Sequence, residues 1–205
     1  MRRNEINRWT SALKASLGGV RGQADRAELL ALHERKDYAG MIRLVRAAMY
    51  LDMPLRIGYV NSGGRATAPA WVRLPVPMPM YGTAAFRATK ITVYLRKSFL
   101  DEVPFSGIVC AMAHELSHVV LESMSHPLRE YEEAVDLTAM ILGFRDIFLE
   151  ETVSQTVRIL DTPPRNWFDK LTGNYPIPDV EIGYTEHRIG YLSKEEQHFA
   201  ASLMQ

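Results

Sequence analysis

The feature that most constrains this chain is a long apolar stretch with charged residues in its middle. The segment GIVCAMAHELSHVVL, residues 107–121, has apolar runs on both sides of the pentapeptide HELSH. This pattern is typical of a helix buried in the core, and Pro104 is well placed near its start. Two histidines and a glutamate in a buried helix need polar partners, because each unsatisfied group costs about 1–3 kcal/mol. The fold must therefore surround this helix and supply those partners.

The rest of the pattern predicts helices on both sides of this stretch and a few strands before residue 96. The helices are expected over residues 25–38, 39–53, 102–124, 128–149 and 193–204, and the strands over residues 55–60, 70–76 and 90–99. We expect a bend near Gly143, and a capping box formed by Ser193 and Glu196. The predicted class is α+β, as one domain over residues 1–205 with a helical N-terminal part over residues 1–53.

Composition limits the class of protein. The chain has 205 residues, 47% of them hydrophobic, which is enough for one domain with a sizeable core. The 24 Lys and Arg residues balance 24 Asp and Glu residues, so we do not expect nucleic acid as a partner. The single cysteine, Cys110, excludes an internal disulfide bond and is expected in the core. Because no secretory signal or membrane span is visible, we expect a cytoplasmic protein.

The pentapeptide HELSH has the spacing of a metal site. Residues four apart share a face of a helix, so His114 and His118 project to one side, one turn apart. Two imidazoles so placed can bind one zinc ion, and Glu115 can act as a general base for a water activated by the metal. The alternative is an ordinary helix whose histidines face solvent. The apolar flanks favour the metal site.

A third ligand is expected from the next predicted helix. Glu132 and Asp136 are four residues apart and share a face there. One can bind the metal while the other orients a ligand histidine through its second ring nitrogen. Glu130 and Glu133 are rivals for the ligand position, and the whole acidic cluster can instead be a solvated face.

The two motifs, AHELSHVVLE and EEAVD, together resemble those of the gluzincin metallopeptidases, which carry HExxH on one helix and Glu-x-x-x-Asp on the next. They are similar to the HtpX/CAAX-prenyl-protease-like group and to the ImmA/IrrE-like peptidases, in which a short strand precedes an AHELxH helix. The resemblance implies a zincin-like fold in which His114, His118 and Glu132 bind zinc. It also implies that Glu115 is the catalytic base and that Asp136 is the partner of a ligand histidine.

The chain departs from these families in several places. Val135, rather than alanine, directly precedes the aspartate of the second motif. Leu121 and Met124 occupy the glycine and histidine positions of the longer metzincin motif, so no third histidine is present there. The resemblance covers residues 90–145 well and the first 60 residues hardly at all.

A late segment, YTEHRIGYLS over residues 184–193, is similar to part of a conserved segment of the HtpX-like group. In zincins a late histidine, tyrosine or arginine often faces the oxyanion that forms when water attacks a peptide carbonyl. By that resemblance His187 is the expected catalytic residue, with Tyr184 and Arg188 as alternatives, and each can instead belong to a surface turn. The remaining histidines have no partner pattern and are expected at the surface: His33, His126 and His198.

The expected function is a zinc-dependent peptidase acting on a peptide or protein substrate. The alternative is a catalytically inactive or regulatory zincin-like binding module, associated with a toxin–antitoxin system or a phage. An open coordination position for water distinguishes the enzyme from a closed structural site. The strand over residues 90–99 can lie at the cleft rim, where a peptide adds to a sheet edge, or in the core, which we prefer.

Overall fold

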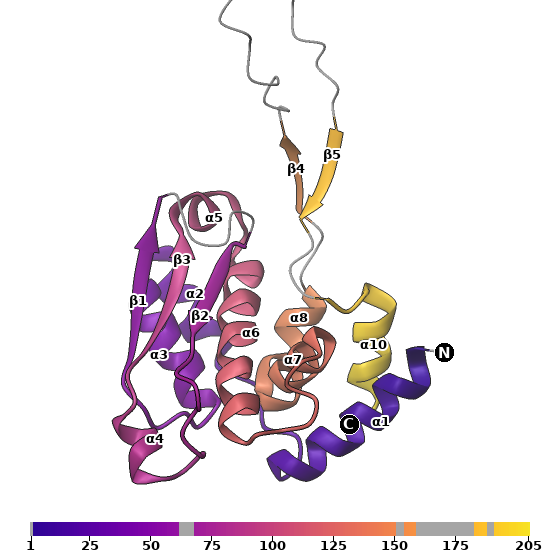
Figure 1. Ribbon diagram of the computed structural model, residues 1–205. Helices are drawn as coiled ribbons and strands as arrows, with labels where there is room; N and C mark the ends of the chain where they lie inside the picture. The colour runs from indigo at the N-terminus through magenta and orange to yellow at the C-terminus, as the bar shows by residue number, and fades with distance from the viewer. Residues whose placement is uncertain (1, 62–67, 151–153, 159–182, 188–190) are drawn as a thin grey trace, which may run out of the picture. The chain divides into compact units, whose positions relative to one another are not determined.

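The computed structural model of the chain describes residues 2–61, 68–150, 154–158, 183–187 and 191–205. They belong to two compact units, one of Met1–Thr152 with Ile189–Gln205 and the other of Val153–Arg188. The second unit contains a hairpin, in which β4 (Ser154–Arg158) pairs antiparallel with β5 (Gly183–His187). The predicted α+β class is confirmed, because helices dominate the first unit and pack beside a small sheet (Figure 1).

The first unit begins with three helices: α1 (Arg2–Leu17), α2 (Arg26–Glu34) and α3 (Tyr38–Ala48). Asp25 and Asp37 cap α2 and α3, because each side chain accepts a hydrogen bond from a backbone N–H of the first turn. The sequence pattern predicted α2 and α3 individually, whereas α1 lies within the predicted helical N-terminal part without having been placed as a separate helix. Helix α1 has few apolar residues, although those at 6, 13 and 17 are spaced to face the core and are buried.

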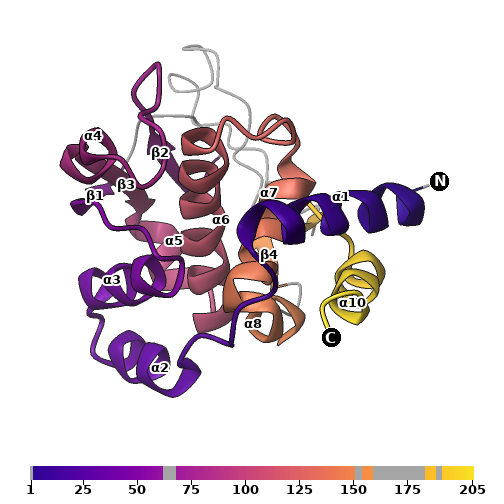
Figure 2. The same ribbon diagram turned by 90° about the horizontal axis from the view of Figure 1, so that it is seen from below.

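A three-stranded sheet follows, made of β1 (Leu55–Val60), β2 (Ala70–Arg73) and β3 (Ile91–Arg96). Strand β3 lies in the centre, parallel to β1 and antiparallel to β2. Its alternate residues are buried under α3 and α6, which lie on one face of the sheet (Figures 1 and 2). The preferred core position of this strand is therefore confirmed, and β2 is the strand beside α6. Two short helices, α4 (Ala84–Ala88) and α5 (Lys97–Glu102), flank β3 in sequence.

Helix α6 (Phe105–Ser123) is the long apolar helix that the sequence predicted, and it begins directly after Pro104. Most of its residues are buried, and Cys110 is fully buried, as expected. Neighbours on several sides, α3, β2, α7 and α8, cover the helix, which explains its apolar flanks. No helix within the described ranges combines the length and apolarity that crossing a bilayer requires.

The helix expected over residues 128–149 is divided into α7 (Glu132–Ala139), a π-helical turn (Met140–Phe144) and α8 (Arg145–Glu150). The predicted bend lies at Gly143, whose φ of +108° is outside the helical region. A side chain there would also lie 2.4 Å from the backbone oxygen of Gly22. The last helix, α10 (Lys194–Ser202), begins with the predicted capping box of Ser193 and Glu196.

One prediction about a histidine was wrong. His126 is only 7% exposed rather than at the surface. Its Nδ1 accepts a hydrogen bond from the backbone N–H of Leu128, and its Nε2 lies 3.2 Å from the hydroxyl of Ser16 in α1. These contacts connect α1 to the turn between α6 and α7.

Candidate metal centre

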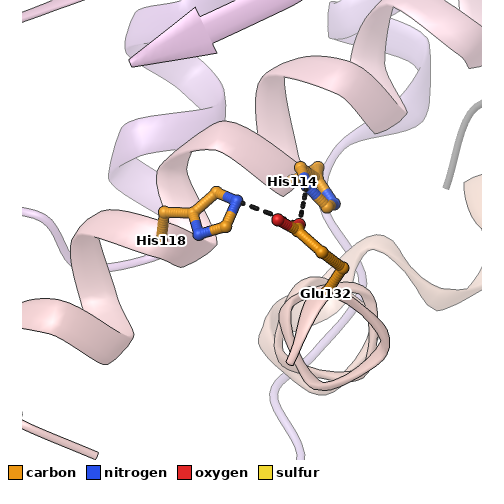
Figure 3. Close-up of side chains that lie close together, drawn as sticks. All are labelled: His114, His118 and Glu132. Carbon is orange, nitrogen blue, oxygen red and sulfur yellow. Dashed lines mark ion pairs between the residues drawn. The ribbon is translucent and has the colours of Figure 1, made fainter. Parts of the chain in front are cut away.

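Three of the predicted ligands meet where α7 packs against α6. His114 and His118 lie one turn apart on α6, and their rings approach the carboxylate of Glu132, the first residue of α7 (Figure 3). Glu132 Oε2 lies 3.2 Å from His114 Nε2 and 3.3 Å from His118 Nε2. One ligand atom from each residue lies within 4.8 Å of those of the other two, so this group could hold a metal ion.

The separations and the donor atoms fit a metal ion. Ligands at two corners of a tetrahedron, each about 2.0–2.1 Å from a zinc ion, are about 3.3–3.4 Å apart. The two measured nitrogen–oxygen distances are close to that value. In addition, Glu132 Oε2 is buried and has no well-oriented hydrogen-bond donor among the described residues. A cation bound between the three side chains would provide the missing partner for this oxygen.

The electrostatics of the centre favour a positive charge between the side chains. Burial by itself would lower the pKa of His114, but its contact with Asp136 and the nearby carboxylate of Glu132 raise it to about 10. The neighbouring imidazoles of His114 and His118 hold the pKa of Glu132 well below its usual range. The carboxylate is therefore ionised, as a metal ligand must be.

Asp136 holds His114 from the side opposite Glu132. Its carboxylate is fully buried, and Oδ1 lies 2.8 Å from His114 Nδ1. The other oxygen, Oδ2, accepts hydrogen bonds from the backbone N–H groups of Tyr191 and Leu192. Because the carboxylate accepts the Nδ1 proton, it leaves Nε2 of His114 available for a metal. Asp136 thus contacts the histidine that the sequence analysis paired it with, and its role beside a bound metal stays a prediction.

Glu115 joins the centre to the sheet. Its carboxylate accepts a hydrogen bond from the backbone of Val72 in β2. Burial raises the pKa of Glu115, and the nearby Glu132 adds to this, whereas His114 and His118 lower it. A carboxyl group with a raised pKa, beside a possible metal site, is suited to accept a proton and return it.

The rival carboxylates contact other partners. Glu133 forms an ion pair with Arg2 of α1, and Glu130 forms one with Arg129 at 3.3 Å. Of the acidic residues that the sequence left open as ligands, Glu132 is the one that lies in the cluster with the two histidines.

The late candidates lie on the second unit or outside the described residues. His187 is the last residue of β5, where it pairs with Ser154, and Tyr184 pairs with Val157. The side chains of this hairpin are not among those described, and Arg188 lies outside the described residues. The catalytic role of His187 therefore stays a prediction.

Tyr191 is a residue of the centre that sequence reasoning missed. Its ring stacks on the ring of His114, with 5.6 Å between centroids and an interplanar angle of 23°, and the residue is 51% exposed. Its position is fixed by the hydrogen bond from its backbone N–H to Asp136. The only available signal was its place in the late segment, where His187 has the more familiar catalytic side chain.

Comparisons of the chain with protein-family models, with curated proteins and with solved structures found no match. Any function has to be argued from the centre itself and from the two motifs that form it.

Proposed function

We propose that the chain is a zinc-dependent peptidase of the gluzincin type, with a zincin-like fold. The observation that supports this most directly is the convergence of His114, His118 and Glu132 around an unpartnered carboxylate oxygen. Two imidazoles and one carboxylate suit zinc better than calcium or magnesium, which prefer oxygen ligands. Three protein ligands are also the usual number in catalytic zinc sites, which keep one position open.

The zinc ion, when bound, would polarise the carbonyl of a peptide bond and acidify a water molecule beside it. Glu115 accepts a proton as the water adds to the carbonyl carbon, and returns that proton to the amine as the C–N bond breaks. Asp136 keeps the Nδ1 proton on His114 and so fixes its orientation.

The position of β2 supports a peptide substrate. Among the described strands β2 pairs with β3 alone, and we propose that an extended peptide pairs with its other edge, called here the free edge. Glu115 contacts the backbone of Val72, which places the proposed base against this strand. Tyr191 is half-exposed and its ring stacks on that of His114, so it lies beside the centre. We place the activity in the cytoplasm, because the sequence has a single cysteine and so cannot form a disulfide bond within the chain.

The test begins with zinc content in protein purified without chelator. We expect about one equivalent, and less than about half an equivalent would contradict the proposal. Glu115→Gln should keep the zinc and lose most of its activity on an unfolded protein substrate, whereas His118→Ala should lose both. Glu122→Gln is the matched control, because Glu122 lies on the same helix and contacts Arg129 instead.

Two results would count against catalysis. An unchanged rate in Glu115→Gln would eliminate the proposed base. Bound zinc with no hydrolysis of any peptide would instead support the regulatory binding module, because the metal would then have a structural role.

A further inference from the structure

Charge is unevenly distributed along this chain of zero net charge. Residues 53–100 contain five arginines and two lysines but no aspartate or glutamate. The rest of the chain therefore has more acidic than basic residues. This segment contains all three strands of the sheet in the first unit. The neutral total therefore conceals a basic sheet.

The charge is concentrated on the face of the sheet opposite α3 and α6. Alternate residues of β3 are buried under those helices, so Tyr94 and Arg96 point to the other face. Trp71 of β2 pairs with Tyr94 of β3. Arg56 of β1 and Arg73 of β2 both pair with the same residue of β3, one from each neighbouring strand. Residues that pair directly share a face. We call this group the arginine face: Arg56, Arg73 and Arg96, with Trp71 and Tyr94 between them.

The aromatic rings of the arginine face are already covered. Trp71 and Tyr94 stack on each other, with 5.3 Å between centroids and 12° between ring planes. The guanidinium of Arg73 lies 5.4 Å from the centroid of Tyr94, and that of Arg96 lies 5.8 Å from the centroid of Trp71. Gly58 makes room for Tyr94, because a side chain there would lie 2.6 Å from the ring. The rings therefore leave little surface on which a nucleobase can stack.

Positive charge, in contrast, remains open to a ligand. Arg56 and Arg73 are exposed, and neither forms an ion pair with any residue that the structure describes. The complementary groups are carboxylates, which a guanidinium binds through two parallel hydrogen bonds.

The arginine face adjoins the free edge of β2, where the proposed substrate pairs. A peptide added to that edge places every second side chain on this face, about 5 Å from Trp71 or Arg73. We propose that the arginine face selects substrates with aspartate or glutamate at these alternate positions, so that the peptidase acts on acidic segments. This inference rests on the proposed function, because it assumes that a peptide pairs with β2.

The test measures the binding of two labelled peptides to zinc-loaded Glu115→Gln protein, which does not consume its substrate. One decapeptide alternates glutamate with alanine, and the other alternates lysine with alanine. We expect the glutamate peptide to bind at least about tenfold more tightly at low salt, and the difference to shrink in 0.5 M salt. The glutamine introduced by this substitution keeps a carbonyl oxygen that can accept the hydrogen bond from Val72.

Charge reversal then locates the contact. Arg73→Glu, made in the same background, should weaken binding of the glutamate peptide roughly five- to tenfold and strengthen binding of the lysine peptide. Arg8→Glu is the control, because Arg8 is an exposed arginine of α1, away from the sheet in sequence, and should change neither affinity.

Three outcomes decide the matter. Equal affinity for the two peptides, or no change in Arg73→Glu, overturns the arginine face as an acidic-peptide site. Tighter binding of a single-stranded oligonucleotide that displaces the glutamate peptide overturns it in favour of nucleic acid. The glutamate peptide can also bind through Arg73 without being cleaved by the wild-type protein. That result supports the arginine face as a binding site and contradicts the proposed peptidase function.

Discussion

Replacing Asp136 by asparagine should weaken zinc binding at the proposed metal centre while the fold is kept. The carboxylate of Asp136 contacts Nδ1 of His114 through one oxygen, and the backbone N–H groups of Tyr191 and Leu192 through the other. Asparagine has one oxygen and one NH₂ group in their place. The asparagine oxygen should face the two backbone N–H groups, because both are donors. The NH₂ group then faces His114.

His114 can then avoid a donor–donor contact only by accepting at Nδ1, which moves its proton to Nε2. That nitrogen is the one 3.2 Å from Glu132 Oε2, and once protonated it cannot bind a metal. To bind the metal, His114 must return to the tautomer with its proton on Nδ1. The Nδ1–H group and the asparagine NH₂ group then face each other in a buried site, which costs about 1–3 kcal/mol. This corresponds to roughly 5–150-fold weaker zinc binding, in line with the 10–100-fold that is typical when a ligand histidine loses such a partner.

The measurement is zinc affinity at pH 7, by competition with a chromogenic chelator, with circular dichroism of the metal-free protein as the check on folding. Asp146→Asn is the matched control, because Asp146 is a half-exposed residue of α8 that pairs with Arg145. The zinc affinity of this variant should stay within about twofold of the wild-type value. An Asp136→Asn protein that folds and binds zinc as tightly as wild type would refute the tautomer argument.

Two further predictions concern stability. Gly143→Ala should lower the free energy of unfolding by about 2–4 kcal/mol, because it combines a positive φ with a contact 2.4 Å from the oxygen of Gly22. Gly19→Ala, at a similar positive φ with open space around it, should lose only about 1–2 kcal/mol, and equal losses in urea unfolding would contradict the packing argument. Burial lowers the pKa of His126, so its contribution to stability is complete above its ordinary pKa of about 6.5 and is lost as the pH falls below that value. His126→Gln should therefore flatten the fall in stability between pH 7.5 and 5, whereas the exposed control His198→Gln should keep the wild-type slope, and identical slopes in both would exclude this role of His126.

The fold could be predicted where the signal is local. The buried helix α6, the bend at Gly143 and the capping box at Ser193 each depend on residues within a few positions of one another. The order of the strands could not be predicted. Strand β2 lies between β1 and β3 in sequence but pairs on the far side of β3, and nothing in the alternation of its four residues encodes that choice.

The same division holds for the metal centre. The helical repeat alone places His114 and His118 on one face, so their proximity was predictable from their spacing. The choice between Glu132 and Glu133 was not, because both lie in the first turn of α7 and the rotation of that helix against α6 decides which one faces the histidines. Arg2 contributes to the outcome by pairing with Glu133, from a helix that the sequence pattern did not place as a separate helix.

The contact that orients His114 could not be found from side-chain identity at all. Asp136 is held by backbone N–H groups that lie 55 and 56 residues later in the chain, and any residue except proline provides such a donor. The sequence therefore carries no specific signal for this contact, although the contact fixes the tautomer of His114 that the proposed metal binding requires. It follows that the path of the main chain at residues 191 and 192, more than the side chains there, controls the basicity and orientation of His114. A substitution that moves this segment would weaken the centre without altering any of its three proposed ligands.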